Sequence, residues 1–165
     1  MVRMDIQTVV VGGMQMSSLI VLKTSDSHGK EIHLPIRIGP VEAAAITTGI
    51  ENHTHPRPFT HDLLSSVIDT LGARLVSVSI VDVRGTTFYA TLQLVRADGS
   101  RTDLDCRPSD AIALAVRMGV PIYAREQVLD TATMPDFQKV EEAAKQEDLD
   151  AFHDFVESLS PEDFA

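Results

Sequence analysis

The sequence predicts an α+β domain in which helices pack on a mixed, largely antiparallel sheet. Two observations lead to this fold class. Segments rich in β-branched residues come in two groups of three, and each group is followed by a helical segment, an order typical of α+β chains. The 165 residues, 44% of them hydrophobic and 23% charged, are enough for one domain with a buried core.

The first group of strands lies in the N-terminal forty residues. Valine-rich and alternating segments predict strands over 2–11, 18–24 and 31–38. Gly39 and Pro40 end the third strand, and Pro40 suits the first position of an alanine-rich helix over 41–50.

A second helix follows a proline-containing loop over 52–59. Thr60 is the expected N-cap of this helix, and Gly72 is expected to end it. Five apolar residues between them share one helical face, which predicts an amphipathic helix packed on the sheet. These residues are Leu63, Leu64, Val67, Ile68 and Leu71.

The second group of strands is followed by a third helix. Alternation predicts strands over 73–83, 86–96 and 100–106, and a short buried strand over 120–124. Asp98-Gly99 is a strong hairpin signal. Pro108 begins a helix that Gly119 closes.

The chain changes character after residue 125. Residues 126–165 hold 2 basic and 12 acidic residues and therefore carry the whole net charge of −10. Two offset apolar stripes beyond Pro135 predict a broken or kinked helix, so we expect a domain over 1–132 and an acidic amphipathic helical tail over 133–165. A neutral body with an acidic tail lacks the basic footprint of a typical nucleic-acid binder.

Three features predict a cytoplasmic protein that does not contact a membrane. The first residues include an early acid and no apolar stretch of signal-peptide length. The single cysteine, Cys106, cannot form a disulfide within the chain, and its apolar neighbours suggest a small core residue rather than a nucleophile. No apolar run approaches the roughly 20 residues of a membrane-spanning helix.

Glu42 and Asp110 are the first candidates for chemistry. The order strand–turn–strand–Pro–helix occurs twice, over 18–50 and 86–119, and both helices open with Pro-x-acid. Each acid on its own is explained by the dipole and free amides of a helix N-terminus. The alternative is that both helix starts deliver a carboxylate to one cleft.

A second candidate group contains His53, His55, His61 and Asp62. His-x-His can chelate zinc or iron, whereas the ordinary structural explanation is a polar loop before a capped helix. A hard cation held by carboxylate oxygens, with a histidine as proton carrier, suits these residue types better than zinc does.

A third candidate group has four charges at a strand-to-helix turn: Asp103, Asp105, Arg107 and Asp110. Helix N-terminal amides at this turn can receive a phosphate, and the alternative is an Arg–Asp pair that locks the turn. Four arginines are candidates for bidentate phosphate binding, although lone arginines are commonly solvated. They are Arg37, Arg57, Arg74 and Arg107.

Three segments carry a resemblance to a known family. They are residues 34–43 (LPIRIGPVEA), 56–64 (PRPFTHDLL) and 105–115 (DCRPSDAIALA). With the closing VPIY at 120–123, they resemble in order and register the bifunctional nuclease domain family, over roughly residues 5–130. The resemblance implies an α+β domain that forms a wedge-shaped homodimer with a groove as its active site. It also implies activity on both DNA and RNA.

The resemblance and the residue types together suggest metal-assisted phosphodiester hydrolysis. The expected ligands of Mg²⁺ or Mn²⁺ are Glu42, Asp62, Asp105 and Asp110. The expected catalytic residues are His61, Asp62, Asp105, Arg107 and Asp110, of which His61 moves a proton. The expected phosphate-binding residues are Arg37, Arg57 and Arg107.

A non-catalytic dimeric regulatory or interaction module is the rival hypothesis. In that case Arg107–Asp110 and His61–Asp62 are structural pairs at a dimer interface, and the acidic tail recruits a basic protein partner or mimics nucleic acid. A small-molecule enzyme that uses the same carboxylates is a third hypothesis, for which the sequence has no cofactor motif. If the tail shields a nucleic-acid groove, deletion of 136–165 strengthens polyanion binding, most visibly at low salt.

Overall fold

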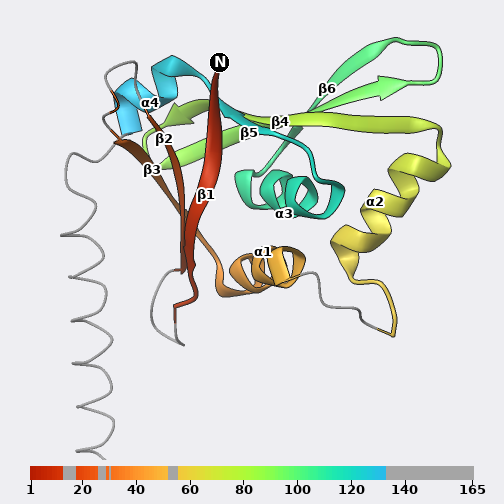
Figure 1. The fold of residues 1–165 in the computed structure, drawn as a ribbon, viewed down its shortest axis with the longest axis horizontal. Helices are drawn as coiled ribbons and strands as arrows, with labels where there is room; N and C mark the ends of the chain where they lie inside the picture. The colour runs from red at the N-terminus through yellow and green to blue at the C-terminus, as the bar shows by residue number, and fades with distance from the viewer. Residues whose placement is uncertain (13–17, 26–28, 30, 52–55, 133–165) are drawn as a thin grey trace, which may run out of the picture. The chain divides into compact units, whose positions relative to one another are not determined.

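A computed structural model describes residues 1–12, 18–25, 29, 31–51 and 56–132 (Figure 1). The predicted acidic tail over 133–165 lies outside the described residues, as do His53 and His55. In the ranges that the structure describes, no helix is both long enough and apolar enough to cross a membrane.

Strands and helices follow one another in the order expected of the α+β plan. The strands are β1 (Val2–Val10), β2 (Ser18–Ser25), β3 (Glu31–Ile38), β4 (Ala73–Arg84), β5 (Thr87–Arg96), β6 (Arg101–Cys106) and β7 (Ile122–Ala124). The helices are α1 (Pro40–Glu51), α2 (Thr60–Thr70), α3 (Pro108–Met118) and α4 (Glu126–Ala132). The predicted fold class is confirmed, while α4 has no counterpart among the predicted elements.

The strands form one seven-stranded sheet in the order β3-β2-β1-β7-β4-β5-β6. All neighbouring strands are antiparallel except β4 and β7, which are parallel. β1 changes partner along its length: Val2–Met4 pair with β7, and Asp5–Val10 pair with β2. A bulge between Ile6 and Thr8 interrupts the second pairing, and bulges increase the local twist of a strand.

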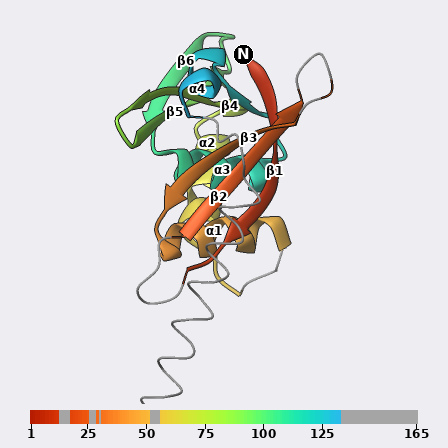
Figure 2. The ribbon, with the colours of Figure 1, turned by 90° about the vertical axis from the view of Figure 1, so that its left-hand side faces the viewer.

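Helices α1 and α3 lie side by side against the sheet, with α2 next to α3 (Figures 1 and 2). α3 packs on β4 and β5 and is the most buried helix of the described chain. It ends as predicted at Gly119, whose φ of +64° is accessible to glycine without a steric penalty. The largest fully buried side chains of the core include Met4, Ile20, Leu22, Leu34, Ile36, Ile46, Leu75, Ile80, Ile112 and Leu114.

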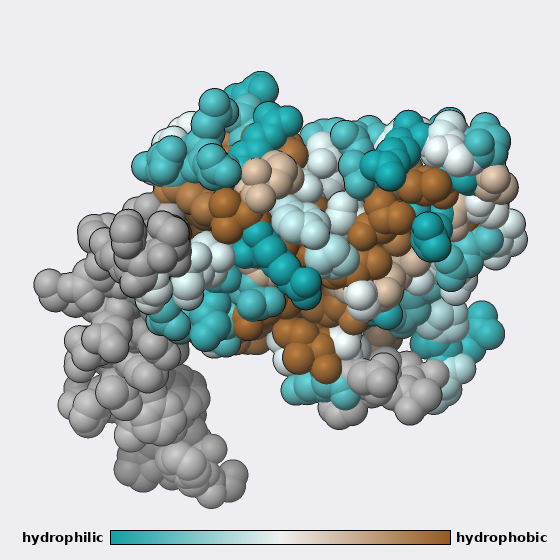
Figure 3. Space-filling view, turned by 45° about the horizontal axis from the view of Figure 1, so that its top comes forward, coloured by the Kyte–Doolittle hydropathy of each residue, from teal (hydrophilic) through white to brown (hydrophobic). Residues whose placement is uncertain are grey.

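The apolar face of α2 differs from the prediction. Ile68 is buried as expected, but the other four apolar residues of this face are exposed by 39–79%. They are Leu63, Leu64, Val67 and Leu71. The amphipathic pattern is therefore present, but the described residues do not cover its apolar side. Figure 3 shows that apolar residues also reach the surface elsewhere, between hydrophilic ones.

Candidate functional site

Arg107 stands at the N-cap position of α3 and binds carboxylates from two helices. Its Nε and Nη2 donate to Oδ2 and Oδ1 of Asp110 at 2.7 and 3.0 Å, a bidentate pair within the first turn of α3. Its Nη1 donates to Oε1 of Glu42, in the first turn of α1, at 2.9 Å. The structure therefore brings the carboxylates of both helix starts onto one guanidinium.

The sequence around Glu42 favours this geometry. Glu42 follows Gly39 at the same spacing by which Asp110 follows Arg107, and a proline begins each helix. A Cβ on Gly39 would overlap Oε2 of Glu42. Because Gly39 has no side chain, the carboxylate can lie over the start of α1 and accept the hydrogen bond from Arg107.

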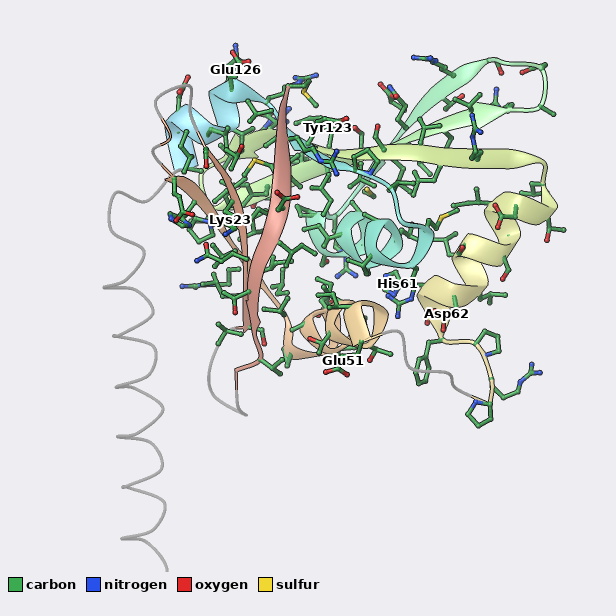
Figure 4. All side chains as sticks on the ribbon, viewed as in Figure 1. Lys23, Glu51, His61, Asp62, Tyr123 and Glu126 are labelled. Carbon is green, nitrogen blue, oxygen red and sulfur yellow. The ribbon has the colours of Figure 1, made fainter. Side chains whose placement is uncertain are left out.

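His61 joins the same group from α2. It extends from the first turn of α2 toward α3 (Figure 4), and its Nε2 lies 3.2 Å from Oδ1 of Asp110. The imidazole is only 14% exposed, so the surrounding residues restrict its movement. We refer to Glu42, His61, Arg107 and Asp110 as the Arg107 cluster.

The charge of Asp110 is stabilised within this cluster. The hydrogen bonds from Arg107 lower the pKa of Asp110, partial burial opposes them, and the hydrogen bond with His61 lowers the pKa further. Asp110 is therefore ionised at neutral pH. A carboxylate that contacts one ring nitrogen of a histidine also fixes the orientation of the ring.

Asp62 does not join the Arg107 cluster, although it is adjacent to His61. Its Oδ1 accepts a 2.6 Å hydrogen bond from Nε of Arg117, and its Oδ2 accepts one of 2.9 Å from the backbone N–H of Phe59. Phe59 occupies the N-cap position and Thr60 is the first helical residue, so the predicted N-cap was placed one residue too late. The carboxylate of Asp62 takes over the capping of α2.

Arg117 was not among the predicted site residues. Its side chain is 9% exposed, and its Nη1 donates to the carbonyl oxygens of Ala45 in α1 and Ala113 in α3, each at 2.9 Å. A Cβ on Gly49 of α1 would lie 2.6 Å from that Nη1, so Gly49 leaves the space that Arg117 fills. The available signal in the sequence is its spacing of seven from Asp110, which puts both on one face of α3.

The other predicted residues lie outside these contacts. Among the described residues, Asp105 makes no hydrogen bond or ion pair with the Arg107 cluster, and its side chain is exposed on β6. Arg57, which precedes α2, and Arg74, on β4, are also exposed. Arg37 is exposed at the end of β3, where it lines a groove together with Arg107.

Cys106 is half-buried and packs against the core. Burial, together with the charges of Asp110 and Asp105, raises the pKa of its thiol to about 12. The thiol is therefore protonated at neutral pH, which agrees with the prediction that Cys106 is not a nucleophile.

The groove beside the Arg107 cluster has a volume of about 460 Å³. Its walls come from the end of β3 and the start of α1, from the start of β5, and from the start of α3. Four strands separate β3 from β5 in the sheet order, so this sheet curls enough for the two strand ends to share one groove. Glu42 and Arg107 belong to both the groove and the cluster.

The described residues contain no group of three His, Cys, Asp or Glu side chains that could hold a metal ion. Of the four predicted ligands, Glu42 and Asp110 bind Arg107, Asp62 binds Arg117, and Asp105 lies apart on β6. This arrangement does not fit a resident metal ion. Mg²⁺ is often held by one or two carboxylates together with substrate phosphates. Binding of this kind does not require three protein ligands in one place.

Comparisons with known proteins agree with the sequence motifs. The family model of the bifunctional nuclease domain matches residues 20–136. An uncharacterized protein of Mycobacterium tuberculosis is 43% identical over 136 residues, which are 80% of this chain and 80% of that protein. Bifunctional nuclease 2 of Arabidopsis thaliana is 32% identical over 112 residues, and bifunctional nuclease 1 of Oryza sativa subsp. indica is 28% identical over 111. Each plant match covers 66% of this chain and 33% of the plant protein.

Proposed function

The chain belongs to the bifunctional nuclease domain family, and on that premise we propose that it hydrolyses phosphodiester bonds of DNA and RNA. The names of the plant relatives support this function, although the chain spans only about a third of their length. The observation within this chain that carries the proposal is the Arg107 cluster: one guanidinium, two carboxylates and a histidine at the rim of a groove.

Phosphodiester hydrolysis joins a water oxygen to phosphorus and breaks the bond between phosphorus and the leaving oxygen. The reaction needs positive charge on the phosphoryl oxygens, removal of a proton from water, and delivery of a proton to the leaving oxygen. Arg107 supplies the charge: Asp110 and Glu42 use three of its N–H groups, and one N–H on each of Nη1 and Nη2 remains to donate to phosphate oxygens.

His61 is the group that transfers the proton in this proposal. Asp110 contacts its Nε2 and holds the ring in place, which leaves Nδ1 to exchange a proton with water or with the leaving oxygen. Glu42 keeps Arg107 extended across the two helix starts, since its carboxylate binds the guanidinium on the side away from Asp110.

Mg²⁺ or Mn²⁺ remains part of the proposal as an ion that enters with the substrate. Such an ion neutralises charge on phosphate oxygens and lowers the pKa of bound water. No step above depends on it, because the described residues form no metal-binding group. Comparison of cleavage in Mg²⁺, Mn²⁺ and EDTA shows whether cleavage requires a divalent metal ion.

The same proposal includes a homodimer, as the family resemblance implies. α2 exposes Leu63, Val67 and Leu71 by 56%, 41% and 79%, and these residues follow one another at helical spacing. An apolar row of this kind on a described surface suits burial against a second copy of the chain.

Cleavage assays with purified protein test the nuclease function. Single- and double-stranded DNA and RNA are incubated with the wild-type chain, with Arg107→Ala and His61→Ala, and with Arg101→Ala as a matched control on the exposed start of β6. We expect both cluster variants to lose activity by about a hundredfold or more while the control keeps it. Equal cleavage by all four proteins indicates a contaminating nuclease, and absence of cleavage by the wild type favours a non-catalytic module.

A further inference from the structure

The groove beside the Arg107 cluster is lined by both apolar and polar residues. The apolar ones include Ile38 and Phe88, which are partly buried against the core. The polar ones include Arg107, the Glu42 carboxylate that it binds, and Ser109 in the first turn of α3. At about 460 Å³, the groove has the size of a small-ligand site rather than that of a channel for a double helix.

Ser109 offers a hydrogen-bonding group to the groove. The residue is 5% exposed, and its hydroxyl makes no hydrogen bond with any residue that the structure describes. Because Ser109 lines the groove, this hydroxyl is available to a partner that binds there.

The surroundings of Ser109 favour an anionic group as that partner. Ser109 is the second residue of α3, whose N-terminus has no side-chain cap. Helix N-terminal amides and a guanidinium together bind phosphate oxygens, and Arg107 lies immediately before this turn. Arg37 lines the same groove from β3, so two arginines and one carboxylate, that of Glu42, contribute charge to it.

Phe88 adds an aromatic residue to the groove, which suits a nucleotide base and is not required for binding of phosphate alone. Phe88 lines the groove at the start of β5, and an aromatic residue beside a phosphate site is the pattern by which proteins stack unpaired bases. A base in a duplex is already stacked between its neighbours and paired with the opposite strand, so it can reach such a groove only after it has been flipped out.

From the arginines and the hydroxyl that line the groove, from Phe88 and from the volume of the groove, we propose that it holds one unstacked nucleotide and that the substrate is single-stranded nucleic acid. This inference rests on the proposed nuclease function and adds to it a binding role for Ser109 and Phe88. The phosphate of the nucleotide contacts Ser109 and Arg107, and its base packs on Phe88.

Binding measured without cleavage tests the inference. The probe is a short fluorescent oligodeoxynucleotide with phosphorothioate linkages, used as a single strand and as the corresponding duplex, and the readout is fluorescence anisotropy with the full chain. We expect the single strand to bind at least about tenfold more tightly than the duplex, since stacking and phosphate contacts are both lost in the paired state.

Two variants and a matched control localise the binding. Ser109→Ala and Phe88→Leu are each expected to weaken single-strand binding by about tenfold. Because Phe88 packs partly against the core, binding is measured at a temperature at which thermal unfolding shows each variant to be folded. Ser100→Ala removes a hydroxyl outside the groove and is expected to leave binding unchanged.

Equal affinity for single strand and duplex, or equal binding by Ser109→Ala and Ser100→Ala, overturns the inference even if the chain cleaves nucleic acid. Preferential single-strand binding by a chain that cleaves nothing supports the groove assignment and refutes the proposed nuclease function. The two failures are therefore distinguishable.

Discussion

Arg117 of α3 and Asp62 of α2 form a salt bridge with 2.6 Å between Nε and Oδ1, and Asp62 is the neighbour of His61. Arg117 also donates to carbonyl oxygens of α1 and α3. One nearly buried guanidinium therefore ties together the three helices whose first turns carry the Arg107 cluster. We therefore expect the contact between His61 and Asp110 to depend on these bonds of Arg117 as well as on their own hydrogen bond.

Replacement of Arg117 is expected to lower both stability and activity. Arg117→Ala removes the salt bridge to Asp62 and the hydrogen bonds to two backbone carbonyls, which costs about 2–4 kcal/mol of unfolding free energy in urea titrations. Arg117→Lys keeps the charge but not the planar fork, so it is expected to fold with a smaller loss of stability and with reduced cleavage. If Arg117→Lys cleaves nucleic acid at the wild-type rate, this salt bridge does not position His61.

Gly49 provides a second test of the contacts that Arg117 makes with the three helices. Gly49→Ala puts a Cβ 2.6 Å from both Nη1 of Arg117 and Cγ2 of Val116, so it is expected to destabilise the fold by about 1–3 kcal/mol despite the higher helix propensity of alanine. The control is a double-mutant cycle with Arg117→Ala. Removal of the long side chain relieves the clash with Arg117 but not the one with Val116, so a partial coupling energy between the two changes is expected, and additive effects would contradict the clash with Arg117.

The lowered pKa of Asp110 makes stability depend on pH. An acid whose pKa is lower in the folded state adds stability that is present above its unfolded value, near 3.8, and is lost as the pH falls through the lowered folded value. The unfolding free energy of the wild type is therefore expected to fall more steeply below about pH 4 than that of Asp110→Asn. Asp103→Asn, which removes an exposed carboxylate of β6, is the control, and a pH dependence shared by all three proteins argues against the prediction.

The sequence predicts most of the fold because the local rules and the tertiary contacts agree there. Alternation locates β3 and β4, which are half-buried strands, and Pro108 and Gly119 mark the ends of α3 because their backbone preferences suit those positions. Helical periodicity also finds the apolar face of α2, but it says nothing about what covers that face. The exposure of Leu71 is decided by the packing of α2 on α3, which no local pattern encodes.

The candidate site is predicted only in part for a similar reason. Motifs identify Arg107, Asp110 and His61, whose contacts lie at helix starts. They do not identify Arg117, because a charged residue in the last turn of a helix is usually solvated or interacts with the helix dipole. Its contact with Asp62 spans 55 residues of sequence and requires α1, α2 and α3 to be in place first.

Cys106 is expected to react slowly in the folded protein. With a pKa of about 12, its thiol has very little thiolate at pH 8, and partial burial restricts access further. Alkylation by iodoacetamide, followed by mass spectrometry, is therefore expected to be at least about tenfold slower in the native chain than in urea. The chain has a single cysteine, so the modified mass reports on this site alone, and equal rates in the two states contradict the buried, protonated thiol.

Charge placed on the exposed face of α2 is expected to dissociate the proposed dimer. Leu63→Lys and Val67→Lys alter side chains that are 56% and 41% exposed, so we expect the fold of one chain to tolerate both changes. In a dimer interface, the lysines of the two copies repel each other and their charges are buried. Sedimentation is expected to give twice the 18.0 kDa monomer mass for the wild type and the monomer mass for the double variant.

The matched control for the α2 face is Val11→Lys, an equally drastic change at a residue that is 53% exposed near the end of β1. It is expected to keep the dimer mass. A monomeric wild type removes the homodimer from the proposal. A Leu63→Lys/Val67→Lys protein that stays dimeric while Val11→Lys dissociates moves the interface from α2 to β1. Because neither surface contains a member of the Arg107 cluster, cleavage by the monomeric variant also shows whether one chain is sufficient for activity.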